Sequence, residues 1–133
     1  MAGVATLAIN LKITGIGDDF EVANSQAITV PVEYQNGYTI VATATTTAIQ
    51  LFDMIDHIAL AKIYGVYLKA EVGTIYISVD TAGTGTITST TADLVLNVGE
   101  SCYLPVNPGG NLGMVIDASA VTDAFSWVIL GKA

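Results

Sequence analysis

The sequence predicts an all-β protein, a jelly-roll-like two-sheet β-sandwich of about eight strands. Three observations favour this fold class. Apolar and polar residues alternate with a period of two along most of the chain, as they do in strands with one covered face. Gly, Pro and Asn break this alternation at short intervals, which is typical of turns between short strands. Thr is frequent, and its β-branched side chain favours a pleated sheet over a helix.

The N-terminal part predicts two strands and a tight turn. Residues 7–13 alternate strictly and predict a half-buried strand, which ends in the Gly- and Asp-rich segment 15–19. Residues 28–34 predict a second strand. Because Pro31 cannot donate a ladder hydrogen bond, we expect this strand at a sheet edge or beside a bulge. Asn36-Gly37 then predicts a two-residue turn, since both residues accept a positive φ.

The middle of the chain contains one ambiguous segment and one long apolar strand. Residues 38–47, which end in a Thr-rich run, predict a strand. Residues 48–57 fit either a short helix or a strand followed by a loop, and we favour the second because Thr has poor helix propensity. In residues 58–72 both alternating sets of side chains carry bulk. Such a strand is central with both faces covered, and a neighbouring subunit is one candidate for the second cover.

The C-terminal half predicts short strands joined by polar loops. Its elements, in chain order, are a turn at Gly73, a strand over 75–79, a loop over 81–91, a strand over 94–98, a turn at Gly99-Glu100, a strand through Cys102 and Leu104, a loop over 105–110, and strands over 112–116 and 125–129. Trp127 alternates with Phe125 and Ile129, which predicts a core position for its ring. We expect residues 1–133 to form a single β-sandwich domain.

Low charge and an acidic excess exclude several classes of partner. Only 12% of the 133 residues are charged, against about 25% in ordinary domains, and the net charge is −8. Such a chain repels phosphate, so we expect no nucleic-acid role and no binding to an anionic membrane surface. The sequence has no apolar run of about 18 residues. It also lacks the pattern of a signal peptide, so neither a membrane span nor a leader is predicted.

No catalytic constellation is recognisable, so the sequence predicts no enzyme activity, cofactor or metal. His57 is the only histidine, and metal or nucleophile sites generally need histidine beside specific partners. Cys102 is the only cysteine and is expected to be a buried, unreactive thiol. Asp18, Asp19 and Glu21 cluster in a turn without the EF-hand spacing. We expect that turn to be solvated, and calcium binding there stays open.

Tyrosines on the predicted strands are the candidates for an interaction surface. Tyr67 and Tyr76 fall on strand faces away from the most regular apolar sets. A partly exposed amphipathic ring is a common interface anchor, although ordinary sheet tyrosines give the same pattern. We expect Ile63, Tyr67, Lys69 and Tyr76 to contribute to an oligomer or partner interface.

Five segments from residue 58 onward follow one another in a distinctive order. They are IYGVYLK (63–69), GTIYIS (73–78), LVLNVGE (94–100), LPV (104–106) and FSWVILG (125–131). This order resembles small β-sandwich proteins of tailed-phage particles. The resemblance implies a virion structural protein, above all a capsid decoration or cement protein, assembled in the host cytoplasm. It implies a symmetric oligomer, with a trimer favoured, that binds the major capsid protein or another virion protein, and it carries over no catalytic residue.

Two other functions fit parts of the sequence. A carbohydrate- or receptor-binding module of a tail or fibre would use the loops over 81–91 and 105–110 with exposed tyrosines. A small hydrolase or metal-dependent enzyme would need Asp53, Asp56 and His57, or the acidic turn, to form a site. The single histidine weighs against this last function.

Overall fold

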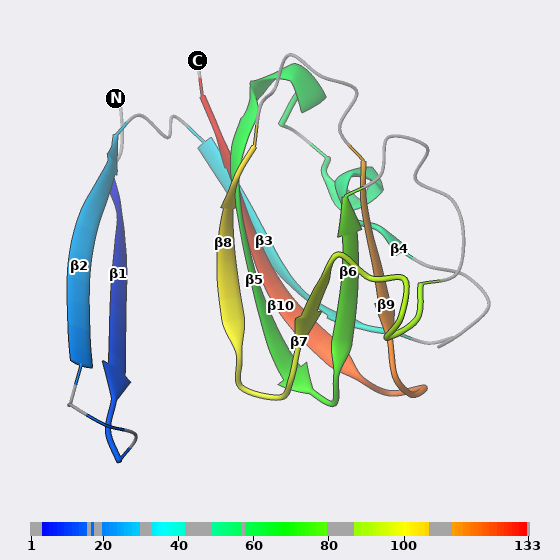
Figure 1. Ribbon diagram of the computed structural model, residues 1–133. Helices are drawn as coiled ribbons and strands as arrows, with labels where there is room; N and C mark the ends of the chain where they lie inside the picture. The colour runs from blue at the N-terminus through cyan, green and yellow to red at the C-terminus, as the bar shows by residue number, and fades with distance from the viewer. Residues whose placement is uncertain are drawn as a thin grey trace.

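The protein is a two-layer β-sandwich with a β-hairpin beside it (Figure 1). The computed structural model describes residues 4–15, 17, 20–29, 33–41, 49–56, 58–79, 87–106 and 113–132. The described strands are β1 (Val4–Ile13), β2 (Phe20–Thr29), β3 (Glu33–Ile40), β4 (Ile49–Gln50), β5 (Ile63–Val72), β6 (Ile75–Val79), β7 (Leu94–Leu96), β8 (Ser101–Pro105), β9 (Met114–Ala118) and β10 (Ala124–Gly131). Two short 3₁₀ turns, η1 (Leu51–Met54) and η2 (Leu60–Lys62), lie between strands. The predicted all-β class is confirmed.

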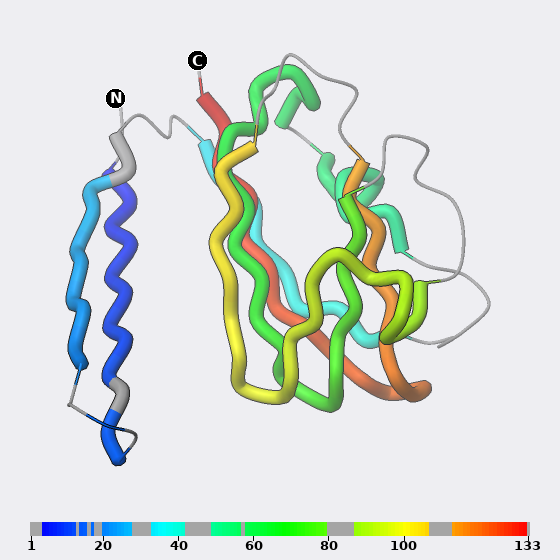
Figure 2. The backbone as a smooth tube through the Cα atoms, in the orientation of Figure 1, coloured from blue at the N-terminus to red at the C-terminus, as the bar shows by residue number. Residues whose placement is uncertain are grey.

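The eight strands from β3 to β10 form a jelly roll. The first sheet has the order β3-β10-β5-β8, and the second sheet has the order β4-β9-β6-β7. All neighbours are antiparallel, and β3 pairs with β10, β4 with β9, β5 with β8 and β6 with β7. This pairing results when one long antiparallel ribbon rolls into two facing sheets. The path can be followed in Figure 2 from the cyan β3 to the red end of the chain.

Alternating side chains of both sheets fill the space between them. Phe125 of β10, Leu68 of β5, and Ile77 and Ile116 of the second sheet are fully enclosed there. Each strand contributes roughly every second residue because successive side chains point to opposite faces. Trp127 belongs to the same cluster and has only 5% of its surface exposed. The core position predicted from its alternation is therefore confirmed.

The indole ring of Trp127 determines how the last strand meets the first strand of the sandwich. Trp127 lies directly opposite Gly37 in the β10–β3 ladder. A Cβ atom at Gly37 would come within 2.5 Å of Trp127 Cζ2, so glycine leaves the room that the ring occupies. The indole Nε1–H donates to Thr39 Oγ1 at 3.0 Å, which satisfies the one polar atom of the ring. The predicted turn at Asn36-Gly37 is therefore wrong, because both residues lie inside β3 and the glycine serves close packing.

β5 is central in its sheet, as predicted, because it pairs with β10 on one side and with β8 on the other. It begins at Ile63 and not at residue 58, and its outer-face residues are half-buried, so the predicted cover of both faces is not seen in one chain. Its ladder with β10 has an irregularity: Leu130 lies opposite Gly65, whereas the next residue, Gly131, lies opposite Ile63. A residue inserted in this way reverses the inward and outward alternation of a strand. Ile63 consequently packs in the core with 1% of its surface exposed, although an outer position was expected.

The outer face of the second sheet is partly covered by its own chain. All five residues of β9 are buried, although every second one points away from the core. The carboxylate of Asp117 accepts hydrogen bonds from the amides of Ile87 (3.2 Å) and Ala118 (2.8 Å). Ile87 is itself buried. The end of the predicted surface loop over 81–91 thus serves as a cover for β9, while residues 81–86 lie outside the described residues.

The N-terminal strands differ from the prediction. The strand predicted over 28–34 is divided, because β2 ends at Thr29 and β3 begins at Glu33, and Pro31 lies outside the described residues. β1 pairs only with β2 and belongs to neither sheet of the sandwich. Among the described side chains of residues 7–13, the predicted half-burial holds for Leu7 only, because Ile9 and Leu11 are 55% and 52% exposed.

The ambiguous segment over 48–57 contains both structures that were considered. β4 supplies two strand residues, and η1 follows as a single 3₁₀ turn. The preceding strand, β3, ends at Ile40, so the strand predicted over 38–47 is shorter than expected; residues 42–48 lie outside the described part.

Replacing Trp127 by alanine should lower the free energy of unfolding by roughly 3–5 kcal/mol, because a large buried side chain leaves a cavity. Gly37→Ala should cost roughly 1–3 kcal/mol, because the added methyl group overlaps the ring. In the double variant that methyl group finds space, so the two costs should not add. Urea unfolding, followed by circular dichroism, measures the free energy of unfolding of the wild type, the two single variants and the double variant. A Trp127→Ala variant of near wild-type stability, or fully additive costs, would contradict this packing.

Candidate functional site

The hairpin of β1 and β2 has one apolar face and one small or polar face. Directly opposed residues of an antiparallel pair share a face, and Leu11 lies opposite Val22 whereas Lys12 lies opposite Glu21. The apolar face carries Leu7, Ile9, Leu11, Phe20 and Val22 together with the polar Asn24 and Gln26, and the other face carries Val4, Thr6, Ala8, Asn10, Lys12, Glu21, Ala23 and Ser25. The large apolar side chains of the apolar face, except Leu7, are between 45% and 55% exposed. Contacts between the hairpin and the sandwich are sparse, so water reaches most of this face.

A second apolar surface lies on the outer face of the first sheet, along its edge strand β3. Burial along β3 alternates strictly between half-buried and exposed residues. Tyr34, Tyr38 and Ile40 point outward with 66%, 57% and 57% of their surface exposed, and Asn36 lies between them. These four residues are termed the β3 row. None of them carries a charge, so the row is a large uncharged strip on an acidic protein.

The middle of the same outer face carries a small charged network that is neutral as a whole. Lys69 Nζ lies 3.1 Å from Glu71 Oε2, and Ser126 Oγ donates to Glu71 Oε1 at 2.8 Å. The hydrogen bond from Ser126 and, after it, the interaction with Lys69 hold the pKa of Glu71 below its ordinary value. The carboxylate is therefore tied within the sheet and is not available as a free anionic group.

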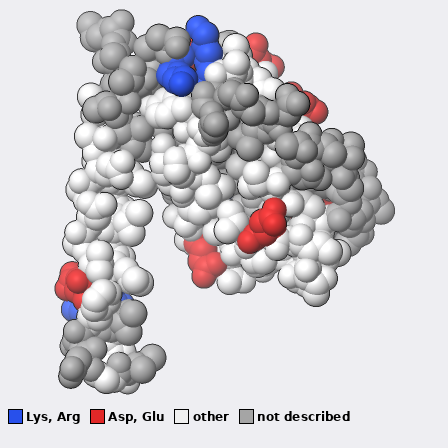
Figure 3. Space-filling view, turned by 45° about the horizontal axis from the view of Figure 1, so that its top comes forward, with Lys and Arg blue, Asp and Glu red and all other residues white. Residues whose placement is uncertain are grey.

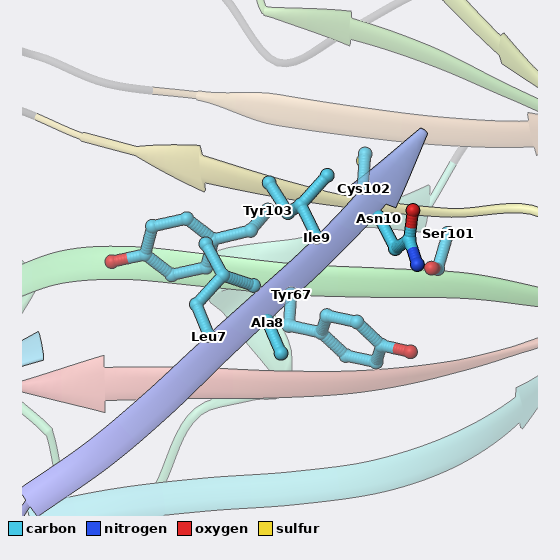
Figure 4. A pocket seen from close by; sticks show the side chains of 8 residues that line it. All are labelled: Leu7, Ala8, Ile9, Asn10, Tyr67, Ser101, Cys102 and Tyr103. Atoms are coloured by element: carbon cyan, nitrogen blue, oxygen red, sulfur yellow. The ribbon is translucent and has the colours of Figure 1, made fainter. Parts of the chain in front are cut away.

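A pocket of about 400 Å³ lies where the hairpin approaches the first sheet (Figure 4). Its lining residues are Leu7, Ala8, Ile9 and Asn10 of β1, Tyr67 of β5, and Ser101, Cys102 and Tyr103 of β8. In the close view β1 crosses above the sheet, and the rings of Tyr67 and Tyr103 lie to either side of it. Tyr103 leans over Gly65, where a Cβ atom would overlap its hydroxyl group and ring. The lining contains no carboxylate and no imidazole, so it offers aromatic surface and a few neutral polar groups.

Burial suppresses ionisation in and beside this pocket. It raises the pKa of Cys102 above the ordinary thiol value of 9.0, so the sulfur stays protonated at neutral pH and agrees with the expected unreactive thiol. Burial also raises the pKa of Tyr103. The pKa of Tyr64 is raised by burial and, to a smaller extent, by its neighbour Tyr103.

The four residues predicted for an interface do not form one surface. Tyr67 and Lys69 lie half-buried on the outer face of the first sheet, Tyr67 at the pocket and Lys69 in the charged network. Tyr76 lies half-buried on β6, in the second sheet. Ile63 faces the core between the two sheets. Alternation alone cannot assign residues to one side of a sandwich, because both sheets have an outer face.

The other predicted candidates are dispersed or lie outside the described part. Asp18, Asp19 and His57 are not among the described residues, whereas Glu21 and Asp53 are exposed. The described residues contain no group of three or more His, Cys, Asp or Glu side chains placed to hold a metal ion. Within the same part of the chain, no helix has the length and apolar character needed to cross a bilayer.

Comparison of the chain with protein-family models, with curated proteins and with solved structures found no match.

The hairpin face and the β3 row were missed as surfaces from the sequence. Their signal is the same period-two pattern that marks core strands, so residues 7–13 were assigned to the sandwich. The one sign in the sequence is that neither alternating set of β3 residues 34–39 contains an aliphatic side chain, whereas β5 and β10 each carry several.

The Ser126→Ala variant should raise the pKa of Glu71 toward its ordinary value of 4.5, because it removes the strongest hydrogen bond to the carboxylate. A lowered pKa in the folded state stabilises the protein above the unfolded value, and this stabilisation is lost as the pH falls through the folded pKa. The variant should therefore lose less stability on acidification below about pH 4.5. NMR titration of the side-chain carboxyl carbons measures the pKa, and Ser101→Ala, opposite Lys69 on β8, is the control. An unchanged Glu71 pKa in Ser126→Ala would refute the assignment.

Proposed function

We propose that the protein is a structural component of a tailed-phage particle, a capsid decoration or cement protein that acts by self-association and by binding to the shell. The observation that carries the proposal is the pair of uncovered apolar surfaces, the hairpin face and the β3 row. Monomeric proteins rarely expose large contiguous apolar surface, and such surface marks a site of protein association. The jelly roll, a common architecture of viral coat proteins, supports the same function.

A non-catalytic role fits the chemistry of the concave site. The pocket beside the hairpin brings together tyrosines, a serine and a thiol whose pKa is raised by burial. General acid–base or nucleophilic catalysis needs a base within hydrogen-bond reach of the reacting group, and the lining supplies neither a carboxylate nor an imidazole. The pocket thus offers packing surface and neutral hydrogen bonds, which supports a role in assembly.

Charge supports the choice of protein partners. The net charge of −8 makes identical copies repel one another over most approaches. The hairpin face and the β3 row are uncharged, and the Lys69–Glu71 pair between the sheet edges is neutral. Copies can thus approach over these surfaces without bringing carboxylates together. The proposed partners are the protein itself, in a symmetric oligomer, and the major capsid protein or another virion protein.

The purified protein should co-sediment with mature capsid shells of its phage that lack it, and it should raise the temperature at which those shells open. Binding that saturates at a fixed number of copies per shell is the expected result, because decoration follows the shell lattice. Bovine serum albumin and a charge-matched, unrelated jelly-roll domain are the controls. If the protein neither binds nor stabilises the shells at micromolar concentration, the decoration function is refuted.

A second candidate function, carbohydrate binding in a tail or fibre, is favoured by the pocket alone. Tyr67 and Tyr103 present aromatic surface there, and Asn10 and Ser101 add neutral hydrogen-bonding groups, a combination suited to an uncharged sugar. If this is the function, a glycan array should give a hit that Tyr67→Ala abolishes and Tyr34→Ala, outside the pocket, leaves intact. An array without any hit at high protein concentration would leave only the assembly function.

A further inference from the structure

We propose that the apolar face of the hairpin of one copy packs on the β3 row of a second copy. This inference rests on the proposed self-association and names the two surfaces that perform it. Each copy offers both surfaces, so each copy can give a hairpin and receive one. When two copies exchange hairpins reciprocally, the exchange closes into a two-fold symmetric dimer.

The hairpin needs a partner that its own sandwich does not provide. A two-stranded hairpin is marginally stable at best in water unless a further strand or layer covers it. β1 and β2 hydrogen-bond only to each other in the described sheets. The apolar residues at the distal end of the hairpin, Leu11, Phe20 and Val22, are each about half exposed. In Figures 1 and 3 the hairpin extends beside the sandwich as an arm, and charged atoms on the visible side of that arm gather near its tip.

The β3 row of the same chain is not the place where its own hairpin lies. The hairpin meets the first sheet at Tyr67 and at residues 101–103, on the β5 and β8 side. β3 is the opposite edge of that sheet, because the strand order is β3-β10-β5-β8. The row therefore remains open in one chain, and a hairpin that covers it comes from another chain.

The two surfaces match in length and in chemistry. At about 3.3 Å per residue, the ten-residue strands of the hairpin extend about 33 Å, and the eight-residue β3 extends about 26 Å. Neither the apolar hairpin face nor the β3 row carries a charged side chain among the described residues. Lys12 and Glu21 lie on the opposite hairpin face, directly across from each other. Joining the surfaces thus buries aliphatic groups against tyrosine rings without burying an ionised group.

The area involved is that of a specific interface. Seven large side chains contribute: Ile9, Leu11, Phe20 and Val22 of the hairpin, and Tyr34, Tyr38 and Ile40 of the β3 row. With about half of each side chain exposed, they present roughly 100 Å² each and about 700 Å² per copy. A standard stable interface buries about 800 Å² per partner. Two copies that exchange hairpins reciprocally therefore bury about 700 Å² each, close to the standard size, whereas a single hairpin-on-row contact buries about half as much per partner.

The first test changes the charge of one hairpin face and then of the other. Leu11→Asp with Val22→Asp places two carboxylates on the apolar face, and Asn10→Asp with Ala23→Asp places two on the opposite face of the same hairpin. Light scattering coupled to size-exclusion chromatography measures the mass in solution. We expect the wild-type and the Asn10/Ala23 variant to be oligomers, and the Leu11/Val22 variant to dissociate at least ten-fold more readily. Trp127 fluorescence and thermal melting check that each sandwich is folded.

The second test locates the contact without weakening the hairpin. One protein carries Leu11→Cys and another carries Tyr38→Cys, both in a Cys102→Ala background. Mixed and mildly oxidised, the two proteins should form a disulfide-linked heterodimer on a denaturing gel. Asn10→Cys replaces Leu11→Cys in the control, which should cross-link at least ten-fold less, because that side chain points away from the apolar face.

Three results would overturn the inference. They are a wild-type protein that stays monomeric at millimolar concentration, an oligomer that survives in the Leu11/Val22 variant, and a Leu11–Tyr38 cross-link no stronger than its control. If the surviving oligomer of the Leu11/Val22 variant also no longer binds shells, the hairpin is assigned to the shell and the decoration function stays intact. Conversely, hairpin exchange without any shell binding would retain the inference and refute decoration.

Discussion

The contact between Trp127 and Gly37 is the constraint on which the rest of the sandwich depends. A jelly roll closes only if its last strand inserts between the first and the third, and β10 does so between β3 and β5. The indole occupies the space that a Cβ atom at Gly37 would fill, and its hydrogen bond to Thr39 Oγ1 ties the ring to the facing strand. One side chain therefore anchors the β10–β3 register and also fills the core between the two sheets.

The outer faces of the two sheets differ in how far the chain itself covers them. On the second sheet, Asp117 accepts a hydrogen bond from the amide of Ile87, and this segment covers part of β9, whereas Val95 of β7 stays exposed. On the first sheet, the charged groups Lys69 and Glu71 neutralise each other, and Tyr34 and Tyr38 stay in water.

The hairpin and the pocket beside it belong to the open side of the molecule. The pocket is lined by β1 of the hairpin and by Tyr67 and Tyr103 of the first sheet, so its shape depends on where the hairpin lies. Burial keeps Cys102 and Tyr103 uncharged, and the surface remains one for packing and neutral hydrogen bonds. The hairpin exposes apolar side chains to water. Their burial in an interface would lower the free energy, because burial of apolar area is the main favourable term in both folding and assembly.

The sequence by itself determined the class of fold, the central position of the strand that contains Tyr67, and the core position of Trp127, because these follow from local alternation and apolar bulk. Only the tertiary structure decided which surfaces stay open. A period of two reveals that a strand has two faces but not what covers each of them, so the strand over residues 7–13 could not be recognised as part of a separate hairpin. Likewise, Asn36-Gly37 has the composition of a turn, and only the ring that packs against Gly37 from β10, ninety residues further along the chain, explains why it is a strand.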